Sequence, residues 1–169
     1  AHADTGELRE SYERAVHAAE GWLARGRTLE SARAFSLIMT LALQTGQHRE
    51  AIETGTRLHA RLVRRDRAAA AIVRARLGAL RLYSGDPESA RRDLDAALRL
   101  LPPRLAIERA EAEVHRATVE FTAGRWTLYL TRTRRALDSY RRAGYWARGY
   151  ALLVNMAEAY IYMGDEPVA

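Results

Sequence analysis

The sequence contains no cysteine and no lysine, and Asn155 is its only asparagine. The absence of cysteine excludes disulfides, thiolate nucleophiles and sulfur-ligated metal sites, and the absence of lysine excludes Schiff-base and lysine–phosphate chemistry. No apolar run approaches the roughly 20 residues that a membrane-spanning helix requires, so we expect no membrane segment. A cysteine-free chain without a signal-peptide pattern is typical of the cytoplasm, which is the localisation we predict.

What the chain does contain is a repeat. A glycine followed by a polar helix start recurs at intervals of 40, 39, 39 and 40 residues. Glycine can adopt a positive φ and end a helix. Between one glycine and the next, the apolar residues follow two helical patterns. The repeat therefore predicts units hinged at Gly6, Gly46, Gly85, Gly124 and Gly164.

Each unit is predicted to be an antiparallel pair of helices. Because one pair is too thin to bury its own apolar face, neighbouring pairs must stack to form a continuous core. With 48% apolar residues in 169, the chain can fill such a core. We therefore predict an all-α fold, a right-handed α-solenoid of about eight helices that forms a single array over residues 1–169. The expected helices span 7–24, 28–45, 47–65, 67–84, 87–101, 104–123, 125–143 and 145–163.

The stretch 77–102 resembles a tetratricopeptide repeat. The residues that carry the resemblance are Leu77, Gly78, Gly85, Ala90, Leu94, Ala97 and Pro102. The stretch from Asn155 is similar, with Met156, Ala157, Tyr160, Gly164 and Ala169. The units are longer than the 34 residues usual in this family. In this they resemble the helical arrays of large bacterial signalling proteins, such as LuxR-type ATP-dependent regulators and myxobacterial serine/threonine kinases.

The resemblance implies a peptide-binding groove lined by the first helix of each pair. It places eleven residues of this chain there, namely Arg33, Thr40, Gln44, Arg76, Tyr83, Glu111, His115, Thr118, Asn155, Glu158 and Tyr162. Asn155 has both a donor and an acceptor suited to a peptide backbone, although an incidental polar residue is an equally good interpretation. Tryptophan and tyrosine residues gather after Gly124, where they either fill the core or anchor a partner.

The net charge of +6 is concentrated in one segment, because residues 57–85 hold eight arginines and one aspartate. Seven of these arginines form a predicted basic ridge of Arg57, Arg61, Arg64, Arg65, Arg67, Arg74 and Arg81. The ridge allows two interpretations. The arginines either fill solvated helix faces and pair with acidic residues of adjacent repeats, or they bind nucleic acid or another polyanion.

Motifs for catalysis are scarce. No HExxH, phosphate-binding glycine loop, GxSxG or calcium loop occurs. Glu111 and His115 are one helical turn apart and supply at most half of a metal site; an exposed polar pair is the simpler interpretation. We therefore predict no enzyme activity, no cofactor and no metal.

The ends of the sequence lack the polar capping helices that close natural arrays. We therefore expect an internal segment of a longer protein, whose uncovered end helices expose apolar surface and self-associate. The leading hypothesis is a protein- or peptide-binding scaffold, the interaction or sensor segment of a larger bacterial signalling or regulatory protein. The alternative is a nucleic-acid or polyanion binder that uses the basic ridge.

Overall fold

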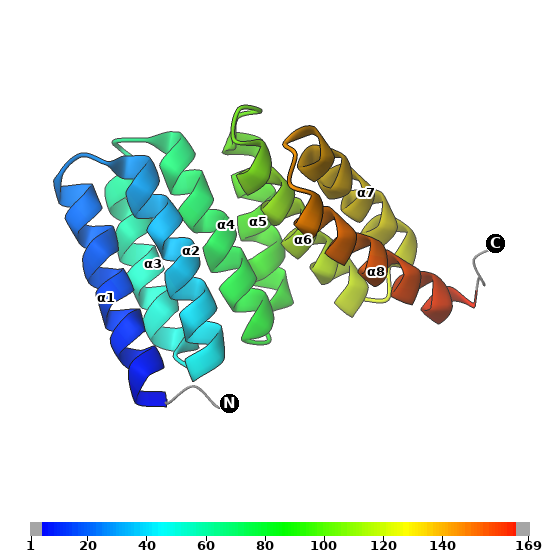
Figure 1. Cartoon of the computed structure of the whole chain (residues 1–169), viewed down its shortest axis with the longest axis horizontal. Coiled ribbons are helices and arrows are strands. Elements are labelled where there is room, and N and C mark those ends of the chain that lie inside the picture. The colour runs from blue at the N-terminus through cyan, green and yellow to red at the C-terminus, as the bar shows by residue number, and fades with distance from the viewer. Residues whose placement is uncertain (1–4, 165–169) are drawn as a thin grey trace. The chain divides into compact units, whose positions relative to one another are not determined.

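The computed structural model describes residues 5–164, and over that range the chain forms eight α-helices and no strand (Figure 1). The helices are α1 (Thr5–Ala24), α2 (Thr28–Thr45), α3 (His48–Leu62), α4 (Arg67–Tyr83), α5 (Pro87–Leu100), α6 (Ala106–Thr122), α7 (Trp126–Arg142) and α8 (Trp146–Met163). The predicted all-α class is confirmed. Ala169, which contributed to the family resemblance, lies outside the described residues.

The repeat glycines have the backbone conformation that the sequence predicted. Gly46, Gly85, Gly124 and Gly164 all adopt φ between 67° and 86°, a left-handed region that is strained for other residues. Gly6 instead lies in the first turn of α1. The helix that differs most from its prediction is α3, which ends at Leu62 because Asp66 starts the next helix. The Asp66 carboxylate accepts hydrogen bonds from the backbone N–H groups of Ala68 and Ala69, both at 3.0 Å.

The helices fall into two compact units, one ending at Leu101 and the other beginning at Pro102. In the first unit, helices pack in chain order: α2 lies against α1, α3 and α4, and α4 also packs against α3 and α5. The side chains at its centre are fully buried and apolar, and they include Phe35, Leu62, Ile72, Leu80 and Leu94. Stacked helix pairs are thus observed within this unit, while a single array over residues 1–169 stays a prediction.

Two glycines allow the helices of the first unit to approach closely. A Cβ at Gly78 of α4 would lie 2.7 Å from Leu94 Cγ of α5, and one at Gly55 of α3 would lie 2.3 Å from Phe35 Cζ of α2. Gly55 and Leu94 occupy equivalent places in successive repeats, 39 residues apart. At this place α3 therefore has a glycine where α5 has a leucine, and the space above Gly55 is filled by the large side chain of Phe35 from α2.

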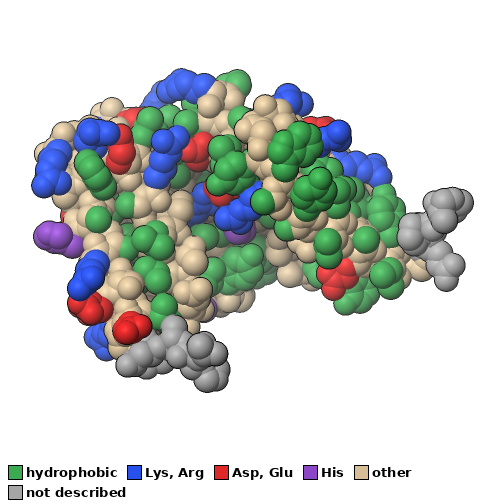
Figure 2. Space-filling model, viewed as in Figure 1, with side chains coloured by type: hydrophobic (Ala, Val, Ile, Leu, Met, Phe, Trp, Pro, Cys, Tyr) green, Lys and Arg blue, Asp and Glu red, His purple; other side chains and the backbone are tan. Residues whose placement is uncertain are grey.

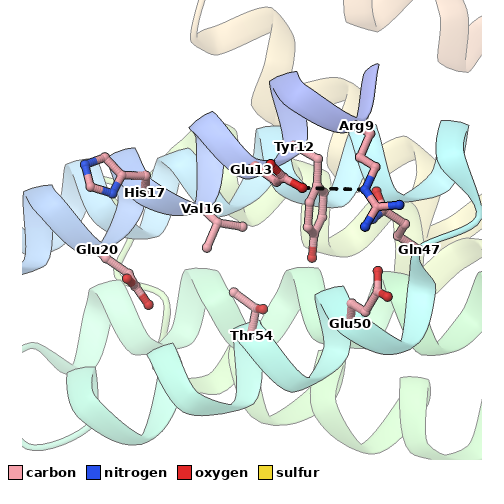
Figure 3. Close-up of a pocket in the computed structure, with 9 residues that line it drawn as sticks. All are labelled: Arg9, Tyr12, Glu13, Val16, His17, Glu20, Gln47, Glu50 and Thr54. Atoms are coloured by element: carbon pink, nitrogen blue, oxygen red, sulfur yellow. Dashed lines mark ion pairs between the residues drawn. The ribbon is translucent and has the colours of Figure 1, made fainter. Parts of the chain in front are cut away.

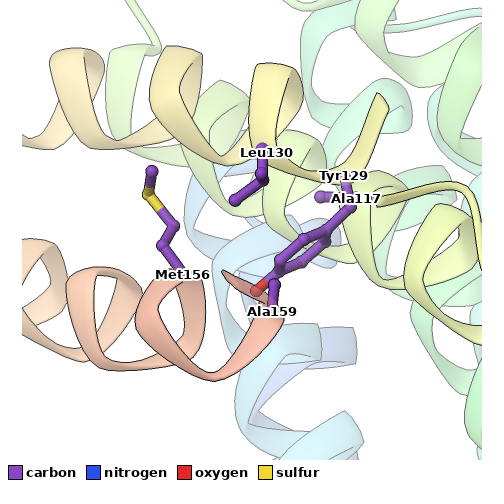
Figure 4. Packing of buried hydrophobic residues seen from close by; sticks show 5 residues of the cluster. All are labelled: Ala117, Tyr129, Leu130, Met156 and Ala159. Atoms are coloured by element: carbon purple, nitrogen blue, oxygen red, sulfur yellow. The ribbon is translucent and has the colours of Figure 1, made fainter. Parts of the chain in front are cut away.

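The second unit packs α7 between α6 and α8. Tyr129 and Leu130 of α7 meet Ala117 of α6 and Met156 and Ala159 of α8 in one buried apolar cluster (Figure 4). A second cluster joins the same three helices towards the other end of α7, through Ala110, Ala136, Tyr140 and Leu152.

A buried ion-pair network adds to the second unit. Glu120 of α6 is almost fully buried and pairs with the guanidinium groups of Arg116 and Arg125. Burial opposes the charge of this carboxylate, but the ion pairs with Arg125 and Arg116 outweigh it and lower the pKa of Glu120 below its ordinary value. Arg116 is thus the partner of a buried charge.

Candidate protein-binding surfaces

In the first unit, the predicted groove residues occupy two adjacent helices. Arg33, Thr40 and Gln44 are exposed on α2, and Tyr83 is exposed at the end of α4. Arg76 differs from them because it is buried, and its Nε donates a hydrogen bond to Ser36 Oγ at 2.8 Å. Arg76 therefore holds α4 against α2.

In the second unit, the predicted groove residues divide between two helices. Glu111, His115 and Thr118 are half-buried on α6, and the Thr118 hydroxyl donates to the carbonyl of Val114 at 3.1 Å. The residues on α8 are exposed and comprise Asn155, Glu158 and Tyr162. Tyr162 stacks on Trp126, with ring centroids 5.7 Å apart and planes 11° from parallel. Each unit thus carries some of the predicted groove residues, and a single groove that contains all of them stays a prediction.

The basic ridge separates into two groups. Arg74 and Arg81 of α4 both pair with Asp93 of α5, with 3.1 Å between Arg74 Nε and Asp93 Oδ1. Asp93 is 7% exposed, so this carboxylate is a buried clamp between the two helices. The remaining arginines are exposed around the end of α3 and the start of α4, and they are Arg57, Arg61, Arg64, Arg65 and Arg67.

A row of apolar side chains on α8 faces solvent. Figure 2 shows hydrophobic side chains gathered at the surface over α7 and α8. The side chains of Tyr150, Val154 and Ile161, which belong to this row, are 66–71% exposed. An apolar groove of about 270 Å³ runs beside it between α7 and α8, lined by Leu137, Trp146 and other residues. We call the row at i, i+4, i+7 and i+11 the α8 stripe; it consists of Tyr150, Val154, Ala157 and Ile161.

The same positions are buried in the equivalent helix of the first unit. Gly164 and Gly85, which follow α8 and α4, are 79 residues apart, so each α8 residue has an α4 counterpart. The counterparts of the α8 stripe are Ala71, Ala75, Gly78 and Leu82, all buried. Gly78 is covered by Ala90 and Leu94 of α5. In the first unit, the place equivalent to Ala157 of the α8 stripe is therefore covered by α5, an amphipathic helix.

A groove of about 370 Å³ lies between α1 and α3 (Figure 3). Tyr12 of α1 points across it towards Glu50 and Thr54 of α3. Tyr12 is 6% exposed, and its hydroxyl forms no hydrogen bond within the part of the chain that the structure describes, although the Thr54 side chain lies near enough to act on its pKa. The sequence did not indicate this site, because Tyr12 stands at helical spacing with Ala15, as an ordinary core residue does.

The described residues hold no group of three or more histidine, aspartate or glutamate side chains placed to bind one metal ion. Within that same range, none of the helices combines the length and apolar character needed to cross a membrane.

Comparisons with known proteins find similarity in solved structures only. No family model matches the chain, and no curated protein matches it. A solved structure described as the crystal structure of MamA protein is similar over 95% of this chain and 97% of its own, at 14% identity and a TM-score of 0.44. At that score the similarity supports no conclusion about function, and the fold class rests on the helix packing described above.

Proposed function

We propose that the chain is a non-catalytic protein-binding scaffold of helix pairs that receives an amphipathic helix of a partner protein on the α8 stripe. The observation that carries the proposal is the equivalence of the α8 stripe with the buried row on α4, whose Gly78 is covered by α5. A scaffold of this kind fits a cytoplasmic signalling or regulatory protein of which the chain is the interaction segment.

The chemistry of the stripe suits a helix. Exposed apolar patches of this kind mark interaction sites, and tyrosine is among the residues that dominate binding energy. An amphipathic helix docks through residues at i, i+4 and i+7, which is the spacing of Ala90, Leu94 and Ala97 on α5. All three of these side chains are fully buried against their neighbours. Because Ala157 has the Cβ that its counterpart Gly78 lacks, the partner we propose presents small apolar residues at that spacing, with no leucine opposite Ala157.

The polar residues implied by the family resemblance extend this proposal. Arg33, Thr40, Gln44 and Tyr83 in the first unit, and Asn155, Glu158 and Tyr162 in the second, are exposed where they can contact a peptide backbone. They are proposed to orient a bound segment, while the apolar stripe supplies most of the affinity.

A peptide titration tests the proposal. A fluorescently labelled peptide with the sequence of residues 87–101, carrying Leu94→Ala to leave room for the Cβ of Ala157, is added to the full chain, and binding is followed by anisotropy. We expect saturable binding that Val154→Glu weakens at least tenfold, since a charge then stands in the buried interface. Ala151→Glu is the matched control, because Ala151 is exposed on α8 outside the stripe and belongs to none of the proposed contacts, and it leaves the affinity unchanged. Equal binding by both variants, or none by the wild-type chain, contradicts the proposal.

Self-association is a second readout of the same surface. Without a partner helix, the exposed stripe is expected to bring copies of the chain together at high concentration. Sedimentation equilibrium then shows a reversible increase in mass for the wild-type chain and a monomer for Val154→Glu. An increase in mass that Val154→Glu does not remove assigns the association to another surface.

A second candidate function, polyanion binding, rests on the five exposed arginines around the α3–α4 turn. Guanidinium groups on neighbouring turns can contact several phosphates, so affinity for DNA would fall steeply with salt. The test compares Arg61→Ala with Arg99→Ala, an exposed arginine on α5, across a salt titration. A loss of affinity and of salt slope confined to Arg61→Ala supports the candidate, and equal slopes contradict it.

A further inference from the structure

The structure points to a second binding site in the groove between α1 and α3: we infer that it accepts an arginine side chain of a peptide segment, with the Tyr12 hydroxyl as a hydrogen-bond acceptor. The site lies within the first unit and involves none of the α8 residues. It goes beyond the proposed function because it specifies a different ligand chemistry.

The Tyr12 hydroxyl is the observation on which this inference depends. A buried polar group without a partner is rare in folded proteins, and each case requires a physical explanation. Burial raises the pKa of Tyr12 above its ordinary value and outweighs the opposing effect of the nearby Thr54 side chain, so the hydroxyl is neutral at pH 7. A neutral hydroxyl offers lone pairs that a cationic N–H donor can reach.

The charges around the groove favour a cation. Four carboxylates line it or act on Tyr12, against two guanidinium groups, Arg9 and Arg57. Arg9 Nε lies 3.5 Å from Glu13 Oε1, and Arg57 Nη2 donates to Thr54 Oγ1 at 3.2 Å. The four carboxylates are those of Glu13, Glu20, Glu50 and Glu53, and His17 also lines the groove.

The carboxylate of Glu50 makes the ligand more specific. Among the residues that the structure describes, it forms no ion pair, and Figure 3 shows it beside the Tyr12 hydroxyl, whereas Glu20 lies towards the other end of the groove. A guanidinium group presents five N–H donors in a planar fork, so it can bind the Glu50 carboxylate and the Tyr12 hydroxyl together. An ammonium group is a compact point charge that lacks this planar fork.

Access to the hydroxyl depends on a flexible side chain. Glu50 is exposed and borders the hydroxyl in Figure 3. Exposed side chains change rotamer within nanoseconds, so Glu50 can turn aside and then close on the bound guanidinium group. The groove volume of about 370 Å³ leaves room for an arginine side chain.

A titration with small capped peptides tests the inference. The full chain, labelled with ¹⁵N, is titrated with acetyl-Ala-Arg-Ala-amide and with the corresponding lysine and glutamate peptides. We expect saturable shifts of backbone signals in α1 and α3 with the arginine peptide, and binding at least tenfold weaker with the glutamate peptide. Comparable affinity for lysine overturns the assignment to arginine, and comparable affinity for glutamate overturns the charge argument.

Two conservative variants separate binding from structure. Tyr12→Phe and Glu50→Gln are each expected to weaken the arginine peptide about fivefold or more, the loss of one charge-assisted hydrogen bond. Because Tyr12→Phe removes only an unpartnered hydroxyl, its thermal midpoint should equal or exceed that of the wild-type chain, whereas a structural role would lower it. Tyr145→Phe and Glu88→Gln are controls that leave affinity unchanged. Unchanged affinity of Tyr12→Phe for the arginine peptide overturns the site. The affinity of Val154→Glu for the same peptide shows whether this site is independent of the α8 stripe.

Discussion

Gly78 of α4 lies directly beneath Leu94 of α5, so that a methyl group added at Gly78 would stand 2.7 Å from the Leu94 Cγ and 3.2 Å from the Ala90 carbonyl oxygen. The backbone carbonyl cannot move without shifting α5. We therefore expect Gly78→Ala to destabilise the fold by about 1–3 kcal/mol, although alanine is the better helix former.

A matched glycine provides the control for that prediction. Gly21 lies inside α1, where an added Cβ would meet only the guanidinium end of Arg25 at 3.4 Å. Gly21→Ala should therefore stabilise the chain by roughly 0.5–1 kcal/mol, through helix propensity alone. Urea denaturation of both variants checks the pair, and a destabilisation of equal size in both would contradict the close contact at Gly78.

The Gly55–Phe35 contact predicts a coupled pair of mutations. Gly55→Ala should cost about 1–3 kcal/mol, because its Cβ would overlap the Phe35 ring. Phe35→Leu removes part of that ring, so Gly55→Ala should cost less in the Phe35→Leu background. A double-mutant cycle measures this coupling, expected at about 1 kcal/mol or more. An additive result would show that the ring and the glycine do not compete for one space.

The Asp93 clamp predicts an effect of charge on stability. Asp93→Asn keeps the side-chain shape but removes the charge that Arg74 and Arg81 share. Since both guanidinium groups are partly exposed and can be rehydrated, we expect a loss of about 1–2 kcal/mol. Chemical denaturation of Asp93→Asn, Arg81→Gln and the double variant checks it. A zero coupling energy would contradict the ion pair.

Glu120 predicts a pH dependence of stability. Its pKa in the folded chain is lower than the ordinary value of 4.5, so its ion pairs contribute fully above about pH 4.5 and are lost as the pH falls through the folded pKa. Glu120→Gln should cost about 3 kcal/mol at pH 7, because it leaves Arg116 buried without its carboxylate. The difference between the two proteins should shrink on acidification, as measured by denaturation at pH 7, 4.5 and 3.

Glu88→Gln serves as the reference for that series. Glu88 forms an exposed pair with Arg91, so its replacement should change stability by less than about 0.5 kcal/mol at any pH. If Glu120→Gln followed the same flat profile, the buried ion-pair network would not contribute to stability.

The sequence predicted the helices well because local signals define them. The spacing of Gly46, Gly85 and Gly124 fixes where helices end, and apolar periodicity shows which segments are helical. The contact between Gly78 and Leu94 follows from the same pattern, since the family resemblance already named both residues.

The candidate sites were less predictable because they depend on which residues meet across helices. In the sequence, Arg81 cannot be told from the exposed arginines of the basic ridge, and only the structure shows its ion pair with Asp93. Arg76 sits at a groove position in the repeat, yet it contacts Ser36 and is buried. The burial of the Tyr12 hydroxyl without a hydrogen bond depends on how α1 faces α3 across the groove, and no local pattern encodes it.

Site-directed disulfide formation tests the central claim, helix docking on the α8 stripe, most directly, because the chain has no cysteine of its own. A peptide of residues 87–101 carrying Leu94→Cys is incubated under mild oxidation with a chain carrying Ala157→Cys, the counterpart of Gly78, or Ala151→Cys, exposed on α8 outside the stripe. The α8 stripe predicts rapid cross-linking at position 157 and little at position 151. Equal cross-linking at the two positions, or none at position 157, would contradict the docking of a helix on this face.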